Sequence, residues 1–151
     1  MAKLMDAVTE FLQQDGWPYE PIDDGSVVRV LFQGDNAQFT CFGQTREDAE
    51  QFVFYSICPV SVPEHKRQEV AEFITRANYD MVLGNYEMDY GDGELRFKTS
   101  IDVEGTQLTP GLIKPLLYAN VLMMDQYLPG VMAVIYADKS PADAIAQVEG
   151  A

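Results

Sequence analysis

Residues 63–103 read PEHKRQEVAEFITRANYDMVLGNYEMDYGDGELRFKTSIDV, and this stretch decides the fold. Its first part predicts a helix from Pro63 to Asn78, because apolar side chains recur there at helical spacing: Val70, Phe73, Ile74 and Ala77. Its second part predicts a hairpin with strands at Met81–Tyr90 and Glu94–Val103 around the turn Gly91-Asp92-Gly93. The second strand alternates apolar and polar residues, which is typical of a strand with one face in water. The predicted helix therefore has a sheet to cover.

The residues before this stretch predict one helix and three strands. The helix carries apolar side chains at helical spacing and ends at Gly16: Leu4, Val8, Phe11 and Leu12. We interpret Tyr19–Gly25 as a linker, because Pro21 and an Asp-Asp-Gly turn interrupt it. The β-branched and aromatic runs that follow predict an antiparallel meander of three strands: Ser26–Gln33, Ala37–Gly43 and Gln51–Cys58.

The C-terminal third predicts a long apolar helix from Thr109-Pro110 to Tyr136, followed by a short helix that begins at Ser140-Pro141. Prolines and polar residues interrupt the apolar run before it reaches the ~20 residues of a membrane span, so we expect no such span. We expect a kink near Pro129. About 25 helical residues measure roughly 38 Å, which exceeds the width of a small sheet. We therefore expect another surface, such as a second copy of the chain, to cover part of it.

These elements give the order α-β-β-β-α-β-β-α. The predicted fold class is α+β, with an antiparallel five-stranded sheet and helices packed on one side. The length of 151 residues fits a single domain, residues 1–151, that buries its own core.

Charge and cysteine content restrict the class of partner. With 24 acidic and 10 basic side chains the net charge is −14, so nucleic acids and anionic membranes are repelled and a basic partner is attracted. Cys41 and Cys58 lie in apolar runs, and two buried thiols suit a reducing compartment better than a disulfide framework does. The first residues lack the apolar stretch of a signal peptide. We expect a cytoplasmic protein.

Several segments of the sequence resemble the YbjN family, and the likeness is closest to its cyanobacterial members. The fold of this family is similar to that of type III secretion chaperones. The segments are Pro63–Tyr79 (PEHKRQEVAEFITRANY), Gly84–Asp89 (GNYEMD), Gly93–Lys98 (GELRFK) and Tyr127–Gly130 (YLPG). The resemblance implies a homodimeric domain without known catalysis, with a chaperone-like surface for a partner protein. It brings no catalytic residues, and a secretion role does not follow from it.

The sequence holds no constellation that predicts catalysis, a metal or a cofactor. His65 is the only histidine, and its place between Glu64 and Lys66 fits a solvated surface residue better than a general base. No nucleophile elbow, phosphate loop or dinucleotide fingerprint occurs. The carboxylates that crowd the second hairpin fit the wet face of a sheet better than a site for calcium or a basic peptide: Glu87, Asp89, Asp92, Glu94, Asp102 and Glu104.

The long helix carries the residues that we single out as a candidate dimer or partner surface: Leu116, Met123, Met124 and Tyr127. Methionine side chains are flexible and adapt to irregular partners, although ordinary core packing explains Met123 and Met124 equally well.

Two classes of function follow. The first is a non-enzymatic protein-interaction module, chaperone-like or regulatory, in which an acidic homodimer holds a segment of an unidentified protein against apolar patches. The alternative is a small-molecule or ion sensor with a pocket between the sheet and the long helix. An enzyme would need a carboxylate such as Glu87 to act without histidine.

Overall fold

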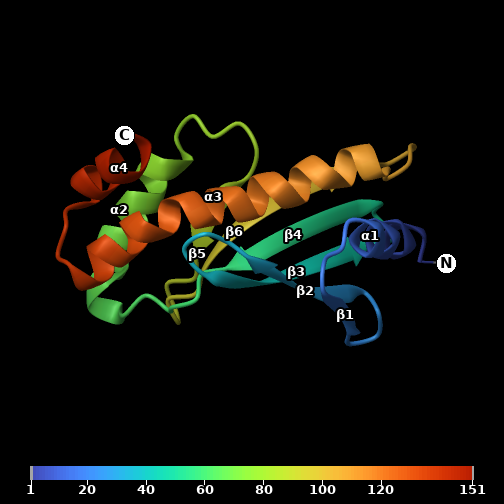
Figure 1. Ribbon diagram of the computed structural model, residues 1–151, viewed down its shortest axis with the longest axis horizontal. Helices are drawn as coiled ribbons and strands as arrows, with labels where there is room; N and C mark the ends of the chain where they lie inside the picture. The colour runs from blue at the N-terminus through green and yellow to red at the C-terminus, as the bar shows by residue number, and fades with distance from the viewer. Residues whose placement is uncertain (1, 151) are drawn as a thin grey trace.

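The computed structural model describes residues 2–150 as a curved sheet with helices on one face (Figure 1). All neighbouring strands are antiparallel, and their order across the sheet is β1-β2-β3-β4-β6-β5. The strand bounds are β1 Tyr19–Ile22, β2 Val27–Gln33, β3 Gln38–Arg46, β4 Gln51–Ile57, β5 Asn85–Met88 and β6 Leu95–Asp102. The predicted α+β class and antiparallel sheet are confirmed.

The sheet has six strands, so the prediction of five was wrong. The additional strand is β1, which lies within the segment interpreted as a linker and pairs from Tyr19 opposite Val30 to Ile22 opposite Val27. Pro21 is compatible with β1 because β1 is the outermost strand, where a missing N–H costs no ladder hydrogen bond. Pro21 therefore lies in an edge strand and does not interrupt the sheet.

Strand β5 is shorter than predicted, because the chain joins the sheet only at Asn85. Gly84 has φ +76°, and a Cβ atom at this position would lie 2.6 Å from the carbonyl oxygen of Lys98. This backbone conformation suits glycine and turns the chain out of the sheet. Residues 79–84 consequently form a loop, although Met81–Gly84 had been predicted as strand.

The helix that opens the deciding stretch forms as expected, after a short 3₁₀ turn. The turn is η1, Glu64–Lys66, and α2 spans Arg67–Asn78. The predicted apolar stripe is buried: Val70, Phe73, Ile74 and Ala77. These residues belong to the core cluster that the helices form with one face of the sheet.

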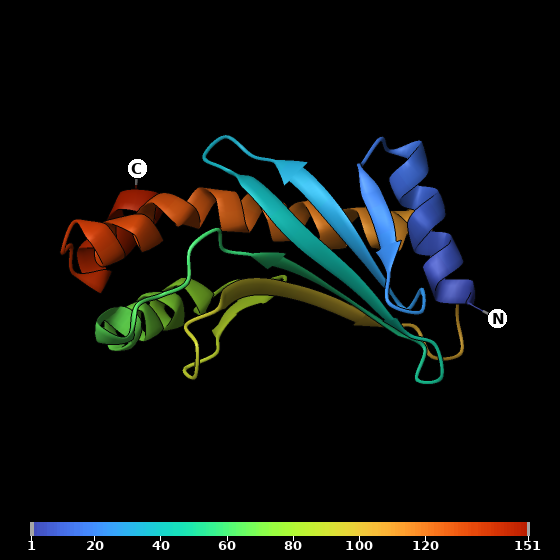
Figure 2. The ribbon, with the colours of Figure 1, turned by 90° about the horizontal axis from the view of Figure 1, so that it is seen from below.

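The remaining helices are α1 Lys3–Gln14, α3 Pro110–Tyr136 and α4 Pro141–Glu149. Helix α3 has 27 residues and continues through Pro129, where a kink was expected. It runs along one face of the sheet, with α1 near one end and α2 and α4 near the other (Figure 2). Within residues 2–150, no helix combines the length and the apolar character needed to cross a bilayer.

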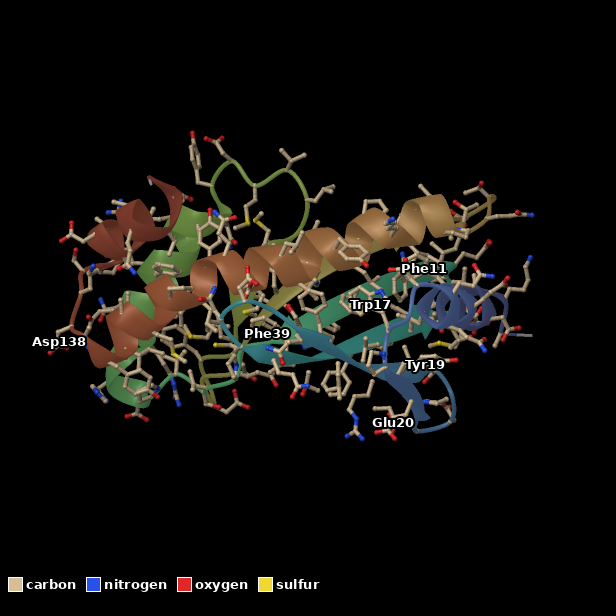
Figure 3. The ribbon with its side chains drawn as sticks, in the orientation of Figure 1. Phe11, Trp17, Tyr19, Glu20, Phe39 and Asp138 are labelled. Carbon is tan, nitrogen blue, oxygen red and sulfur yellow. The ribbon has the colours of Figure 1, made fainter. Side chains whose placement is uncertain are left out.

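Trp17 connects α1 to α3 (Figure 3). Its indole Nε1 donates a hydrogen bond to Asp15 Oδ2 at 2.9 Å, and the Tyr118 hydroxyl of α3 donates to the same oxygen at 2.6 Å. The Trp17 ring also packs against Phe32 of β2, with 5.4 Å between ring centroids. One aromatic side chain thus joins both helices to the sheet.

Asn120 fixes α3 on the sheet through a fully buried polar network. Its Nδ2 donates to the carbonyl oxygens of Phe54 at 2.9 Å and Phe97 at 3.0 Å, which belong to β4 and β6. Its Oδ1 accepts the Ser56 hydroxyl at 2.5 Å, and the Thr99 hydroxyl donates to the Leu116 carbonyl at 2.9 Å. Because buried polar groups are costly unless paired, these bonds select one rotation of α3.

Asp125 provides a second anchor for α3. Its carboxylate, which is buried, accepts the backbone N–H groups of Asp35 and Asn36, each at 2.9 Å. A Cβ atom on Gly34 would lie 2.5 Å from Asp125 Oδ1, so glycine lets the β2–β3 turn approach this closely. The one acidic side chain of the long helix therefore serves the fold.

We predict that Asn120→Ala lowers the free energy of unfolding by about 2–4 kcal/mol, because it leaves the Ser56 hydroxyl unpaired and opens a cavity. Urea denaturation followed by circular dichroism measures this change. Lys114→Ala, an exposed change on the same helix, is the control and stays within about 0.5 kcal/mol of wild type. Equal effects of the two changes would contradict the anchoring role of Asn120.

Candidate protein-binding surface

Three of the four residues singled out on α3 share one face of the helix. Leu116, Met123 and Tyr127 are separated by seven and four residues, which returns them to the same side. The Tyr127 ring packs against Tyr86 of β5 at 6.1 Å between centroids, and the Tyr86 hydroxyl donates to the Met123 carbonyl at 3.3 Å. This face of α3 is therefore directed toward the β5 edge of the sheet.

A single chain covers most of this set. Met124 is fully buried and lies in the core cluster, while Leu116 and Tyr127 keep less than a tenth of their surface exposed. The Tyr127 hydroxyl donates to Glu149 of α4 at 2.6 Å, and burial with this bond raises its pKa well above the usual value. Met123 is only partly buried. Within one chain the accessible surface on this side therefore consists of Met123 and its exposed neighbours.

The loop between α2 and β5 exposes more apolar surface than the predicted residues do. Val82 is 92% exposed and Tyr79 is 79% exposed, and Leu83 adds a further half-exposed side chain. The loop ends at β5, whose Tyr86 contacts the Met123 turn of α3, so loop and α3 share this side of the molecule (Figure 1). We name Tyr79, Val82, Leu83, Met123 and Leu122 the apolar patch.

The outward side of α3 carries a stripe without charge. Leu112, Pro115, Ala119 and Leu122 follow one another at spacings of three and four residues, and all are exposed or partly exposed. Leu122 is 51% exposed. Scattered apolar residues are normal on a protein surface, but a stripe of this kind beside an apolar loop is typical of a contact surface.

The sheet face opposite the helices is open and holds an ionic cluster. Glu87 Oε1 accepts Arg96 Nε at 2.6 Å, and Glu87 Oε2 accepts Lys98 Nζ at 3.2 Å. The Arg96 guanidinium also lies 3.9 Å from the centroid of the Tyr55 ring. Burial acts to raise the pKa of Glu87, but its two cationic partners outweigh burial and lower it. This carboxylate is ionised and paired, so it lacks the raised pKa of a general acid.

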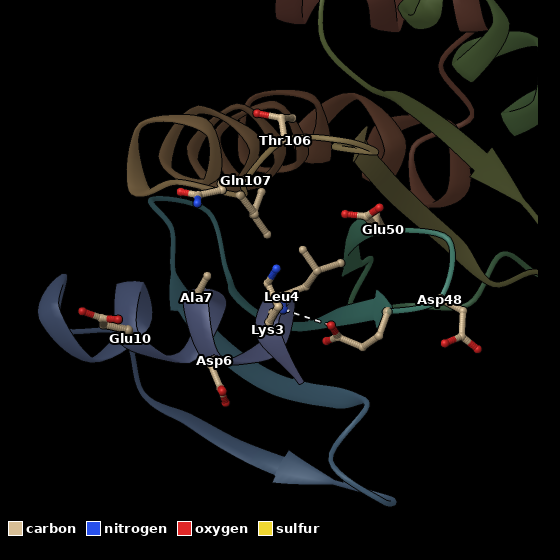
Figure 4. A pocket seen from close by; sticks show the side chains of 11 residues that line it. Lys3, Leu4, Asp6, Ala7, Glu10, Asp48, Glu50, Thr106 and Gln107 are labelled. Carbon is tan, nitrogen blue, oxygen red and sulfur yellow. Dashed lines mark hydrogen bonds between the residues drawn. The ribbon is translucent and has the colours of Figure 1, made fainter. Parts of the chain in front are cut away.

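A cleft of about 650 Å³ lies between α1, the β3–β4 turn and the segment before α3 (Figure 4). Five carboxylates line it: Asp6, Glu10, Glu47, Asp48 and Glu50. Glu47 is already engaged, because it accepts the backbone N–H groups of Leu4 and Met5 at 3.0 Å and so caps α1. The cleft is therefore not the pocket that a sensor was expected to have between sheet and long helix. Fully buried side chains pack into that space, among them Ile113, Leu117 and Val121.

The side chains that could act as nucleophiles, bases or metal ligands lie apart from one another. Cys41 and Cys58 are buried free thiols, and burial raises the pKa of Cys41 to about 12, which leaves it unreactive. His65 is exposed on η1, as the sequence indicated. Across residues 2–150, no three histidine, cysteine or acidic side chains are placed together to hold a metal ion.

A family model described as "Putative bacterial sensory transduction regulator", named YbjN, matches residues 5–132. The chain belongs to the YbjN family. This match confirms the family that the sequence resembled, whereas the cyanobacterial subtype stays a prediction. No curated protein sequence matches this YbjN-family chain at a significant level.

Solved structures share the fold at low sequence identity. E. coli YbjN matches with a TM-score of 0.60 and 10% identity over 89% of this chain and 90% of its own. The ExsC–ExsE complex matches with a TM-score of 0.57 and 17% identity over 84% and 92%. The Yersinia pestis type III secretion chaperone SycH, in complex with a fragment of YscM2, gives 0.51 and 14% over 80% and 96%. The predicted likeness to type III secretion chaperones is confirmed for the fold.

The sequence did not predict that the loop residues of the apolar patch are exposed. It assigned Val82 and Leu83 to a strand because they are apolar and precede an alternating run. Gly84 was the available signal, since glycine within a strand pattern often marks a change of backbone direction.

We predict that Glu87→Gln lowers stability at pH 7 by about 0.5–1 kcal/mol, the effect of a partly exposed ion pair. The pKa of Glu87 is lowered in the folded state, so its contribution is present above the unfolded pKa of about 4.3 and disappears as the pH falls through the folded pKa. Urea midpoints at pH 7 and pH 3 measure this: the difference from wild type narrows at pH 3. The exposed change Glu104→Gln is the control, and an equal loss at both pH values for Glu87→Gln would contradict the pairing.

Proposed function

We propose that this protein is a non-enzymatic protein-interaction module, chaperone-like or regulatory, that holds a segment of a partner protein against the apolar patch. The observation that carries the proposal is the exposure of Val82, Tyr79 and Leu83 in one loop beside α3. Exposed apolar side chains that cluster in this way cost solubility, and association with another protein covers them.

The net charge of the chain and the separate positions of its potentially reactive side chains support the same proposal. A net charge of −14 favours a basic partner segment and opposes binding to nucleic acid or an anionic membrane. The cytoplasm is the proposed location, because two free buried thiols are stable in a reducing compartment. ExsC was solved in complex with ExsE and SycH in complex with a fragment of YscM2, which supports a binding role for this fold by analogy.

A homodimer is the second part of the proposal. The stripe from Leu112 to Leu122 is uncharged, whereas two chains of charge −14 repel each other over most of their surfaces. An antiparallel pairing of two α3 stripes would bury apolar side chains without bringing carboxylates together. The partner segment would then occupy the loop side of the patch.

We predict that Val82→Asp reduces capture of partner proteins from a native lysate about fivefold or more, which corresponds to about 1 kcal/mol. Quantitative mass spectrometry of crosslinked pull-downs measures this. Thr106→Asp adds the same charge at another exposed position and serves as the matched control. Unchanged capture by Val82→Asp, or an equal loss in both variants, would contradict the proposal.

We predict that the chain is a dimer at about 50 µM and that Leu122→Asp dissociates it, because a carboxylate in the stripe would be buried or would repel its copy. Light scattering coupled to size exclusion gives the mass directly. Thr106→Asp should remain dimeric. A monomeric wild type would refute this interface.

A further inference from the structure

The outer edge of β6 is only half paired. Strand β6 has eight residues and β5 has four, and their register runs from Asn85 opposite Lys98 to Met88 opposite Leu95. Among residues 2–150, no strand pairs with Thr99–Asp102 on this side. In Figure 2, β6 continues beyond the end of β5, and no other strand is drawn along its outer side.

The register identifies the backbone groups that this edge presents. Val103 N–H donates to the Glu50 carbonyl, and Cys58 N–H donates to the Leu95 carbonyl, so odd-numbered residues of this strand bond toward β4. Ladder bonds alternate along an antiparallel strand. The N–H and C=O groups of Ser100 and Asp102 therefore point away from β4, toward the unoccupied side. Both residues have exposed side chains.

The surroundings of this edge can accommodate an added strand. Helix α3 passes over β6 here, since the Thr99 hydroxyl bonds the Leu116 carbonyl. Ile101 lies on the helix side of β6 and is only partly buried. A hollow of about 300 Å³ lies on the open face at the same end, lined in part by Ser100 and Asp102. An added strand would thus meet apolar atoms on one face and polar atoms on the other.

We propose that the free edge of β6 binds an extended basic segment of a partner protein as an added antiparallel strand, in line with β5. The added strand places a lysine or arginine opposite Asp102 and an apolar residue opposite Ile101. This inference rests on the proposed function and specifies a second contact beside the apolar patch. Exposed sheet edges commonly bind partners in this way, with main-chain bonds giving affinity and alternate side chains giving specificity.

Charge decides between a basic segment and a second copy. Asp102 and Glu104 lie at the free end of β6, and Asp80 lies in the loop that leads to β5. Pairing β6 with β6 of a second copy would bring the acidic ends of both strands together, on top of a charge of −14 on each chain. A lysine opposite Asp102 gains attraction in place of this repulsion. The edge therefore fits a basic strand better than it fits itself.

The test is NMR on the full chain, labelled with ¹⁵N, with the peptide Val-Lys-Val-Thr-Val as the probe. In the free chain the amides of Ser100 and Asp102 should exchange with solvent at least about tenfold faster than those of Thr99 and Ile101, which bond to β4. The peptide at about 1 mM should slow exchange at Ser100 and Asp102 and give contacts to Ile101. The peptide Val-Glu-Val-Thr-Val should bind at least about twofold more weakly.

Two variants make the test specific. Asp102→Asn keeps one side-chain oxygen, which can still accept the Glu104 N–H, but it removes the negative charge and should weaken binding of the lysine peptide about two- to fivefold. Ser100→Pro removes an outward N–H, as Pro21 does on the opposite edge, and should abolish binding in a chain that circular dichroism shows to be folded.

Several results would overturn the proposal. Protection of Ser100 and Asp102 in the free chain that disappears on dilution would mean that a second copy covers the edge. Equal binding of both peptides, an unaffected Asp102→Asn, or shifts confined to other strands would also overturn it. If Val82→Asp loses partner capture but no peptide binds at β6, the proposed function is supported and only the proposal of a binding site at the β6 edge is wrong.

Discussion

The burial of Asn120 against two strands is the constraint on which the rest of the structure depends. Its side chain bonds the main-chain carbonyls of β4 and β6 in the middle of the sheet, where no water is available to replace them. This fixes the rotation of α3 about its axis. Asp125, five residues and therefore about 7.5 Å further along the helix, fixes the same rotation. A long apolar helix on a small sheet would otherwise have several nearly equivalent orientations.

The fixed rotation determines which side chains stay outside. Met124, Leu117 and Ile113 are enclosed in the core, whereas Leu122 and the stripe that contains it face away from the sheet. Gly84 has a comparable effect at the other side of the patch, because its backbone turns Val82 and Leu83 out of β5. It also shortens β5 and leaves the end of β6 unpaired. The backbone geometry at Gly84 and the two polar anchors of α3 therefore produce both exposed surfaces.

Apart from β1, the order of the strands and main helices was predictable, because each of these elements has a hydrophobic pattern that tertiary contacts did not override. The stripe of α2 and the alternation of β6 are examples. The edge strand β1 was not predictable from its own composition, since whether Pro21 breaks or borders a sheet depends on which side lies next to another strand. The sequence also did not show which side chains of α3 face the core and which face outward. Nearly every residue of that helix is apolar, so hydrophobicity alone did not separate Met124 from Leu122.

We propose that the apolar patch contacts another protein, and site-specific photocrosslinking in cells tests this proposal most directly. A photoreactive amino acid at Val82 should form crosslinks to a defined partner, identified by mass spectrometry of the joined peptides. The same amino acid at the exposed position Thr106 should not form them. Identical products from both positions, or none from Val82, would contradict the account.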